Sequence, residues 1–170
     1  FLRLKPTRFF KVVFPTLPVI PIICAKLLSL VALAKEFNEE FINAFLKMLP
    51  KKTFNSILEV GIGTGAVAEK VVENIGPLIG IDISKEMISQ INHPNITAML
   101  GDAQKLEFDN NTFDLIYMRN VIHYIDNPDL VFSEVYRCLQ PGGYFLFSQV
   151  VPPDDSISEE YDWLVGRGIH

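Results

Sequence analysis

The sequence predicts an α/β fold in which a parallel, doubly wound β-sheet carries helices on both faces. Short apolar runs alternate with segments of helical periodicity from residue 36 onward. A glycine-rich loop stands directly between the first apolar run and a helical pattern. The 170 residues, 49% hydrophobic and 21% charged, match about one globular domain. We therefore assign residues 36–170 to a single domain.

The first expected element is a core-facing helix that begins at Glu36, because apolar residues recur at helical spacing until Pro50 ends the run. Strands and helices then alternate. The expected strands are 56–60, 78–81, 96–100, 113–118 and 144–150, and the expected helices are 66–74, 85–91 and 129–139. A turn at residues 141–143 should separate the last helix from the last strand. Right-handed crossovers between such strands make the sheet parallel.

Residues 1–35 differ in composition from the rest of the chain. They hold six Lys or Arg and no acidic residue, which leaves nine of the 15 basic residues against 20 acidic ones in the remaining sequence. The apolar run 12–34 has features of a secretory signal, of a membrane span and of an organelle-targeting leader. Pro15, Pro18 and Pro21 disfavour a straight spanning helix.

We favour a helical lid or a membrane-surface contact through residues 9–34, over a cleaved leader or foreign sequence. An apolar lid would suit an apolar small molecule. The acidic body offers no basic stripe, so nucleic acid is not an expected partner. Cys24 and Cys138 have neither CxxC nor His-rich spacing, which predicts reduced thiols and no metal site.

The glycine-rich loop predicts a nucleotide-type binding site. Gly61, Gly63 and Gly65 alternate between a strand and a helix, where bare backbone lets a ligand approach the helix N-terminus. The same residues, with Ala66, also satisfy the dinucleotide fingerprint, so the loop alone leaves two cofactor classes open. Glu59 precedes the loop, where a carboxylate would repel a pyrophosphate but could hold an ammonium group.

Two further carboxylates are expected at the same edge of the sheet. Asp82 follows the second strand, where it could accept both hydroxyls of a ribose in either cofactor class. Asp102 and Ala103 follow the third strand, where the carboxylate could accept from an adenine amine and a backbone N–H could meet a ring nitrogen. Three acids at successive strand ends favour a nucleoside site over three unrelated helix caps.

Taken together, these motifs resemble those of class I S-adenosylmethionine-dependent methyltransferases. The resemblance covers residues 52–150 and is carried by 59–65, Asp82, 101–103 and 139–145. Residues 117–125 are most similar to the small-molecule branch that includes ubiquinone and menaquinone biosynthesis enzymes.

The resemblance implies a Rossmann-like sheet with parallel strands in the order 3-2-1-4-5. It also implies two C-terminal hairpin strands, which we expect to be missing, so that we interpret the chain as a fragment. Glu59 and the loop 61–65 would hold the methionine portion of S-adenosyl-L-methionine. Asp82 would hold the ribose, and Asp102 with Ala103 the adenine.

The implied activity is methyl transfer to an O, C or N atom of a small acceptor, in one interpretation an apolar one, by in-line displacement. Main chain near Asn120 would close over the methionine end. His123 is the candidate base that removes the acceptor's proton. The alternatives are a cofactor-binding fragment without turnover and an NAD-dependent oxidoreductase. We expect a cytoplasmic location, with membrane association as a variant, and the sequence leaves the oligomeric state open.

Overall fold

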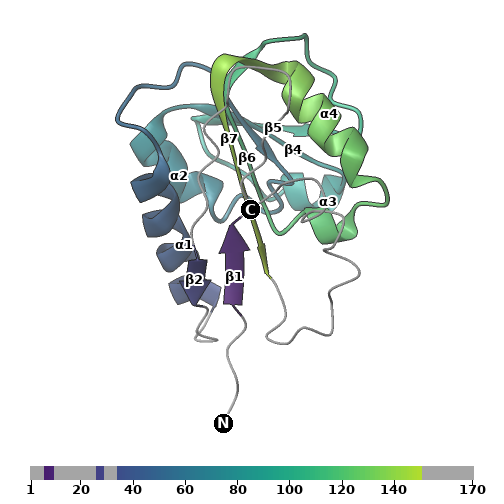
Figure 1. The fold of residues 1–170 in the computed structure, drawn as a ribbon. Helices are drawn as coiled ribbons and strands as arrows, with labels where there is room; N and C mark the ends of the chain where they lie inside the picture. Colours follow the sequence, from purple (N-terminus) through teal and green to yellow (C-terminus); the bar gives the residue numbers. More distant parts are fainter. Residues whose placement is uncertain (1–5, 10–25, 29–33, 151–170) are drawn as a thin grey trace.

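The computed structural model describes residues 6–9, 26–28 and 34–150, which build a seven-stranded sheet with helices on both faces (Figure 1). The strands are β1 (Pro6–Phe9), β2 (Lys26–Leu28), β3 (Ile57–Val60), β4 (Leu78–Asp82), β5 (Ile96–Leu100), β6 (Phe113–Arg119) and β7 (Leu139–Val150). The helices are α1 (Ala34–Met48), α2 (Ala68–Ile75), α3 (Lys85–Ile88) and α4 (Pro128–Cys138), with a 3₁₀ turn η1 (Ile122–Tyr124).

Five parallel strands form the centre of the sheet in the order β5-β4-β3-β6-β7. Counted along the chain, this order is 3-2-1-4-5, which confirms the predicted topology. The chain winds from β3 outward to β5, and then crosses back to β6 on the other side of β3. The carboxyl ends of β3 and β6 therefore flank a topological switch point, where open α/β sheets bind their ligands.

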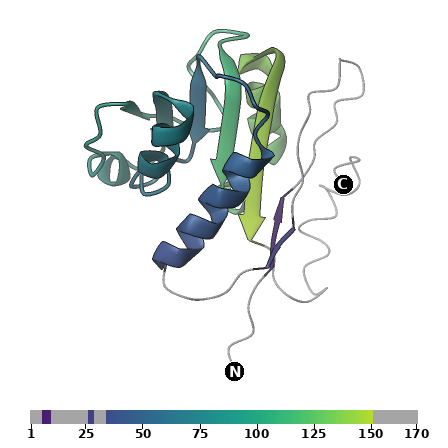
Figure 2. The same cartoon turned by 90° about the vertical axis from the view of Figure 1, so that its left-hand side faces the viewer.

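Two hydrophobic cores hold the layers together. One core packs α1 and α2 on one face of the sheet, through Phe41, Phe45, Val71 and the sheet residue Leu115. The other core packs α4 on the opposite face. The two views agree that α1 and α4 lie on opposite sides (Figures 1 and 2). The first six residues of β6 are buried, as expected for a central parallel strand. This burial explains why the sequence of β6 is mostly apolar.

Two local expectations differ from the structure. Helix α3 ends at Ile88, earlier than the expected residue 91. The turn expected at 141–143 lies inside β7 as an irregularity, because Phe113 pairs with Leu139 whereas Leu115 pairs with Tyr144. Gly142, with a φ of 78°, provides the backbone bend that this extra length of β7 requires.

The N-terminal segment contributes strands in the described part. β1 pairs antiparallel with β7 and with β2, so two strands extend the sheet beyond its parallel centre. A wholly helical lid over 9–34 is therefore wrong at 26–28, where the chain forms β2. Residues 10–25, including Cys24, and the C-terminal residues 151–170 lie outside the described residues. No helix in the described part has the length and apolar character needed to cross a membrane.

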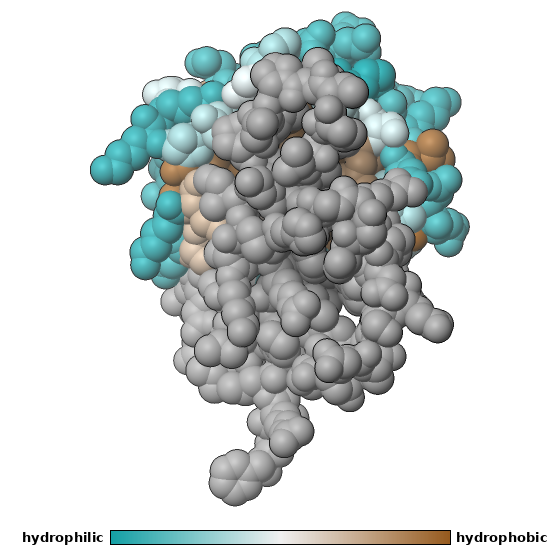
Figure 3. Space-filling view, in the orientation of Figure 1, coloured by the Kyte–Doolittle hydropathy of each residue, from teal (hydrophilic) through white to brown (hydrophobic). Residues whose placement is uncertain are grey.

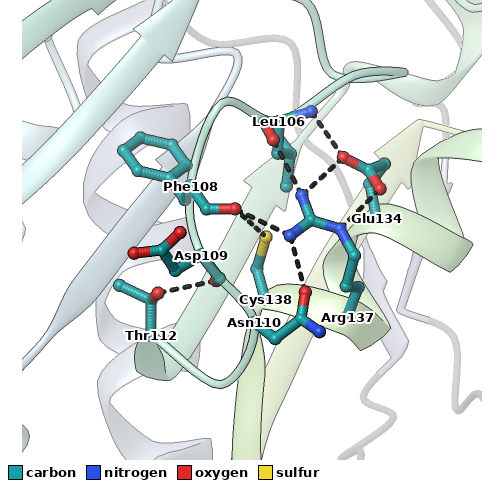
Figure 4. A network of polar contacts seen from close by, with 8 residues as sticks. All are labelled: Leu106, Phe108, Asp109, Asn110, Thr112, Glu134, Arg137 and Cys138. Carbon is teal, nitrogen blue, oxygen red and sulfur yellow. Dashed lines mark hydrogen bonds and ion pairs between the residues drawn. The ribbon is translucent and has the colours of Figure 1, made fainter.

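A polar network anchors the loop between β5 and β6 onto α4 (Figure 4). The Arg137 guanidinium donates to the carbonyl oxygens of Leu106 and Phe108, at 2.8 and 2.7 Å. It also pairs with the Glu134 carboxylate at 2.8 Å, which in turn accepts from the Leu106 N–H. The hydrogen bond from Arg137 holds the pKa of Glu134 below its ordinary value. Asp102 and Ala103 lie in the same loop, shortly before the residues that this network anchors.

We expect Arg137→Met to lower the free energy of unfolding by about 1–3 kcal/mol, because the loop carbonyls lose a charged donor. Urea denaturation would measure the loss. Lys105→Met is the matched control, since it removes an exposed cation from the same loop. Equal stabilities of the two variants would contradict the anchoring role of Arg137.

Candidate functional site

The glycine-rich loop lies at the switch point and is fixed by backbone hydrogen bonds. The N–H groups of Gly61 and Ile62 both donate to the carbonyl oxygen of Ile81, at 2.8 and 2.9 Å. Gly61, Gly63 and Gly65 have φ values of 75°, 57° and 80°. This left-handed conformation favours glycine, so the loop cannot keep its path with ordinary residues at these three positions.

The space around each glycine differs. A Cβ at Gly61 would overlap the Val121 side chain, and one at Gly65 would contact Ile91 at 3.0 Å. These two glycines therefore allow the loop to pack closely against its neighbours. At Gly63 a Cβ would meet nothing within 4 Å. The middle of the loop thus presents bare backbone to open space, as a site for a ligand against main chain requires.

Asp82 lies beside this loop at the end of β4. Its Oδ2 accepts from the Gly63 N–H at 2.8 Å, and its Oδ1 accepts from the Ser84 N–H at 2.9 Å. A carboxylate has about four acceptor positions, so each oxygen retains capacity for a further donor such as a ribose hydroxyl. The structure brings Asp82 and the glycine loop together, as the sequence predicted.

Asp102 and Ala103 follow β5, the next strand. The Asp102 Oδ1 accepts from the Gln104 N–H at 2.8 Å, and Ala103 is buried. Ile83 and Leu100, at the ends of β4 and β5, expose 76% and 61% of their surface. Exposed apolar side chains beside carboxylates suit a flat, apolar ring with polar edges. Sequence reasoning missed Ile83, although an apolar residue directly after a strand-end acid was visible.

Glu59 is buried in β3 and bonded to β6. Its Oε2 accepts from the Tyr117 hydroxyl at 2.7 Å, and only 3% of its surface is exposed. Burial raises the pKa of Glu59 to about 8, against the opposing effects of the Tyr117 hydrogen bond and the nearby Arg119. Near neutral pH this carboxyl is therefore mostly uncharged, and a nearby cation would favour its ionised form.

The β6 end of the switch point carries Arg119 and Asn120. The Arg119 guanidinium carbon lies 4.9 Å from the centre of the Phe41 ring on α1. Asn120 has a φ of 54°, which is uncommon for a residue other than glycine, and its N–H donates to the Ser148 carbonyl at 2.8 Å. This backbone bend leads the chain into η1, and Val121, the residue after Asn120, packs beside Gly61.

His123 lies in η1, and its side chain is outside what the structure describes. Tyr124, the next residue, exposes 80% of its surface.

The visible surface of the described residues is mainly hydrophilic along its upper part, with small apolar patches at the flanks (Figure 3). Cys138 is a buried free thiol at the end of α4. Among the described residues, no three His, Cys, Asp or Glu are grouped to hold a metal ion.

This sheet, with its glycine loop and strand-end carboxylates, defines a Rossmann-like domain of the class that binds nucleoside cofactors. The family profile described as "Methyltransferase domain" matches residues 58–147. The chain belongs to this methyltransferase domain family.

Two relatives illustrate the similarity. Phosphoethanolamine N-methyltransferase 3 of Arabidopsis thaliana is 34% identical over 111 residues, which cover 61% of this chain and 23% of that protein. A malonyl-[acyl-carrier protein] O-methyltransferase of Marinomonas is 28% identical, with 66% and 44% covered. The chain thus spans less than half the length of these two proteins.

Solved structures agree with the fold. Phosphoethanolamine N-methyltransferase 2 of Haemonchus contortus, in complex with S-adenosyl-L-methionine, is 28% identical with a TM-score of 0.63. The match covers 76% of this chain and 33% of that one. The PH0226 protein of Pyrococcus horikoshii is 27% identical with a TM-score of 0.62, and the match covers 69% of this chain and 58% of that one.

We predict that Gly63→Val lowers the affinity for S-adenosylhomocysteine at least tenfold, because the new side chain enters the open space beside the loop. Calorimetric titration would measure it. Gly142→Val is the matched control, since Gly142 also combines a positive φ with open space but lies inside β7. Both variants bear a strain of about 1–2 kcal/mol. Equal affinities of the two variants would remove the loop from the site.

Glu59→Gln should remove a pH-dependent loss of stability. A carboxyl whose pKa is higher in the folded than in the unfolded protein destabilises the fold as the pH rises between the two values, here from 4.5 to about 8. We expect the variant to match the parent near pH 4.5 and to exceed it by about 3–5 kcal/mol at pH 8.5. Urea denaturation at both pH values would test this. The same difference in the free energy of unfolding between variant and parent at both pH values would contradict the raised pKa of Glu59.

Proposed function

We propose that the protein transfers a methyl group from S-adenosyl-L-methionine to a small-molecule acceptor. The observation that carries the proposal is the loop at 61–65, whose bare backbone at Gly63 faces open space and donates to the Asp82 carboxylate. Membership of the methyltransferase family gives this loop its chemical meaning. Because the chain covers less than half of the Arabidopsis and Marinomonas methyltransferases described above, the activity of the whole protein is part of the proposal.

The site residues fit the parts of this cofactor. The free acceptor positions of Asp82 suit the two ribose hydroxyls, and Asp102 with Ala103 suits the adenine edge, with Ile83 against the ring. Glu59 and the loop suit the methionine end, where the ammonium group would favour ionised Glu59. Binding would then release protons from Glu59, because this carboxyl is mostly protonated near pH 7 in the free protein.

When bound, the cofactor supplies a methyl group on a sulfonium, from which a neutral thioether is an excellent leaving group. The protein's own task is to align donor and acceptor and to exclude water. The bend at Asn120 would bring main chain over the methionine end. A hydroxyl or acidic carbon acceptor also needs a base, and His123 in η1 is our candidate for it.

The acceptor that we propose is a small molecule. The relatives named for phosphoethanolamine and for malonyl-acyl-carrier protein suggest polar acceptors, and a sterol 24-C-methyltransferase, 30% identical over 134 residues, suggests an apolar one. Quinols of the ubiquinone and menaquinone type join this group through the resemblance of residues 117–125. We place the reaction in the cytoplasm, where the cofactor is made, with residues 9–34 as a proposed membrane contact.

Calorimetric titration with S-adenosylhomocysteine and with NADH tests the cofactor class. We expect the protein to bind S-adenosylhomocysteine and not NADH. Binding of NADH alone would replace the proposal by an oxidoreductase. Transfer of a labelled methyl group to phenol, quinol, sterol or phosphoethanolamine acceptors then tests turnover, with Gly63→Val as the inactive reference. Binding without transfer to any of them would favour a cofactor-binding module.

A further inference from the structure

A second polar group lies on the α1 face of the sheet, beyond the residues assigned to the cofactor. In the parallel register, Glu59 pairs with Tyr117, and Arg119 pairs with Ser148 on β7. Residues that alternate along a strand share a face, so Tyr117 and Arg119 face the same side. Ser148 shares its side with Leu146, which belongs to the core under α1. Arg119 and Ser148 therefore lie side by side on this face.

Ser148 is unusual because its hydroxyl is buried without a partner. The residue exposes 2% of its surface, and among the described residues its Oγ makes no hydrogen bond. Leaving a buried hydroxyl unsatisfied costs about 1–3 kcal/mol. An alanine here would avoid that cost. A buried hydroxyl without a partner among the described residues therefore points to a ligand that completes its hydrogen bonding.

Arg119 gives this position its charge. Its guanidinium lies against the Phe41 ring and near the carboxyl of Glu59, which accepts from the Tyr117 hydroxyl. A guanidinium presents several N–H donors in one plane, a geometry that matches the oxygens of a carboxylate or a phosphate. The Phe41 ring beside it suits an apolar body attached to such a group.

Three of the proposed cofactor residues lie on the other side of the switch point from this group, whereas Asn120 directly follows Arg119. Glu59, Asp82 and Asp102 belong to β3, β4 and the loop after β5, on one side of the switch point. Ser148 belongs to β7, two strands from β3 on the other side. A ligand there would approach the methionine end from the side opposite the nucleoside.

We propose that the Ser148 hydroxyl and the Arg119 guanidinium bind the anionic group, a carboxylate or a phosphate, of the methyl acceptor. This inference rests on the proposed methyltransferase function. It narrows the acceptor to an acid, whose apolar part would contact Phe41.

Titrations with inorganic phosphate and with hexanoate test the site, each with and without saturating S-adenosylhomocysteine. Chemical shifts of the backbone amides of Asn120 and Ser148 would report binding. We expect at least one anion to bind in the presence of S-adenosylhomocysteine. We also expect Ser148→Ala to weaken it at least threefold and Arg119→Lys at least fivefold. Lys47→Gln, which removes an exposed cation from α1, should leave anion affinity unchanged.

The titrations with and without S-adenosylhomocysteine distinguish the anionic group of an acceptor from the carboxylate of the cofactor itself. If S-adenosylhomocysteine displaces the anion, the site takes the cofactor's own carboxylate and the acceptor proposal is wrong. Failure of both anions to bind, or equal binding by the parent and both variants, also overturns it. If S-adenosylhomocysteine itself fails to bind, the methyltransferase proposal fails, and any anion binding then describes another function. Preference for hexanoate over phosphate would assign a carboxylic acid.

Stability measurements separate a ligand role of Ser148 from a structural one. Because the Ser148 hydroxyl has no partner in the part of the chain that the structure describes, Ser148→Ala should keep or raise the midpoint of thermal unfolding while anion affinity falls. A lower midpoint with unchanged anion affinity would make Ser148 a purely structural residue and overturn the inference.

Discussion

The hydrogen bond from the Gly63 N–H to the Asp82 carboxylate is the interaction on which the site depends. It ties the loop after β3 to the end of β4, while the Ile81 carbonyl fixes the start of the same loop through two further N–H groups. The Asp82 carboxylate positions the loop and also retains capacity to accept further hydrogen bonds. It can therefore serve both the structure and ligand binding. The bare backbone at Gly63 is thus held in place before a ligand arrives, which reduces the ordering that binding requires.

Burial of Glu59 is the second constraint, and it opposes stability. The core under α1 could have been built from apolar residues alone, yet it encloses a carboxyl whose pKa is raised to about 8. Such groups are concentrated at functional sites, where an unfavourable environment prepares them for a charged ligand. Arg119 and Ser148, whose hydroxyl has no hydrogen-bond partner among the described residues, extend the same polar strip to β7. This face of the sheet therefore combines a helix-covered core with a line of polar groups.

Local patterns predicted most of the fold. Apolar runs and helical spacing identified α4 and the central strands other than β7 nearly to the residue, and the strand-end positions of Glu59, Asp82 and Asp102 followed from them. Interactions between distant segments could not be read from the sequence. The Pro-Gly-Gly signal at 141–143 indicates a turn locally, but pairing with β6 makes it part of β7. The Tyr117–Glu59 bond and the Arg137 network likewise depend on register and on the loop path, which no local pattern contains.

The pairing of β1 with β7 has a consequence for how the chain folds during synthesis. Thr7 pairs with Val150, so β1 meets this partner only after the whole stretch between them has left the ribosome. The β3-β4-β5 half, which carries the loop and Asp82, needs only nearby sequence and can assemble earlier. Contacts between such distant segments form slowly because a long loop must close first. Until β7 has been synthesised, β1 has β2 as its partner, and its other edge stays open to wrong pairing.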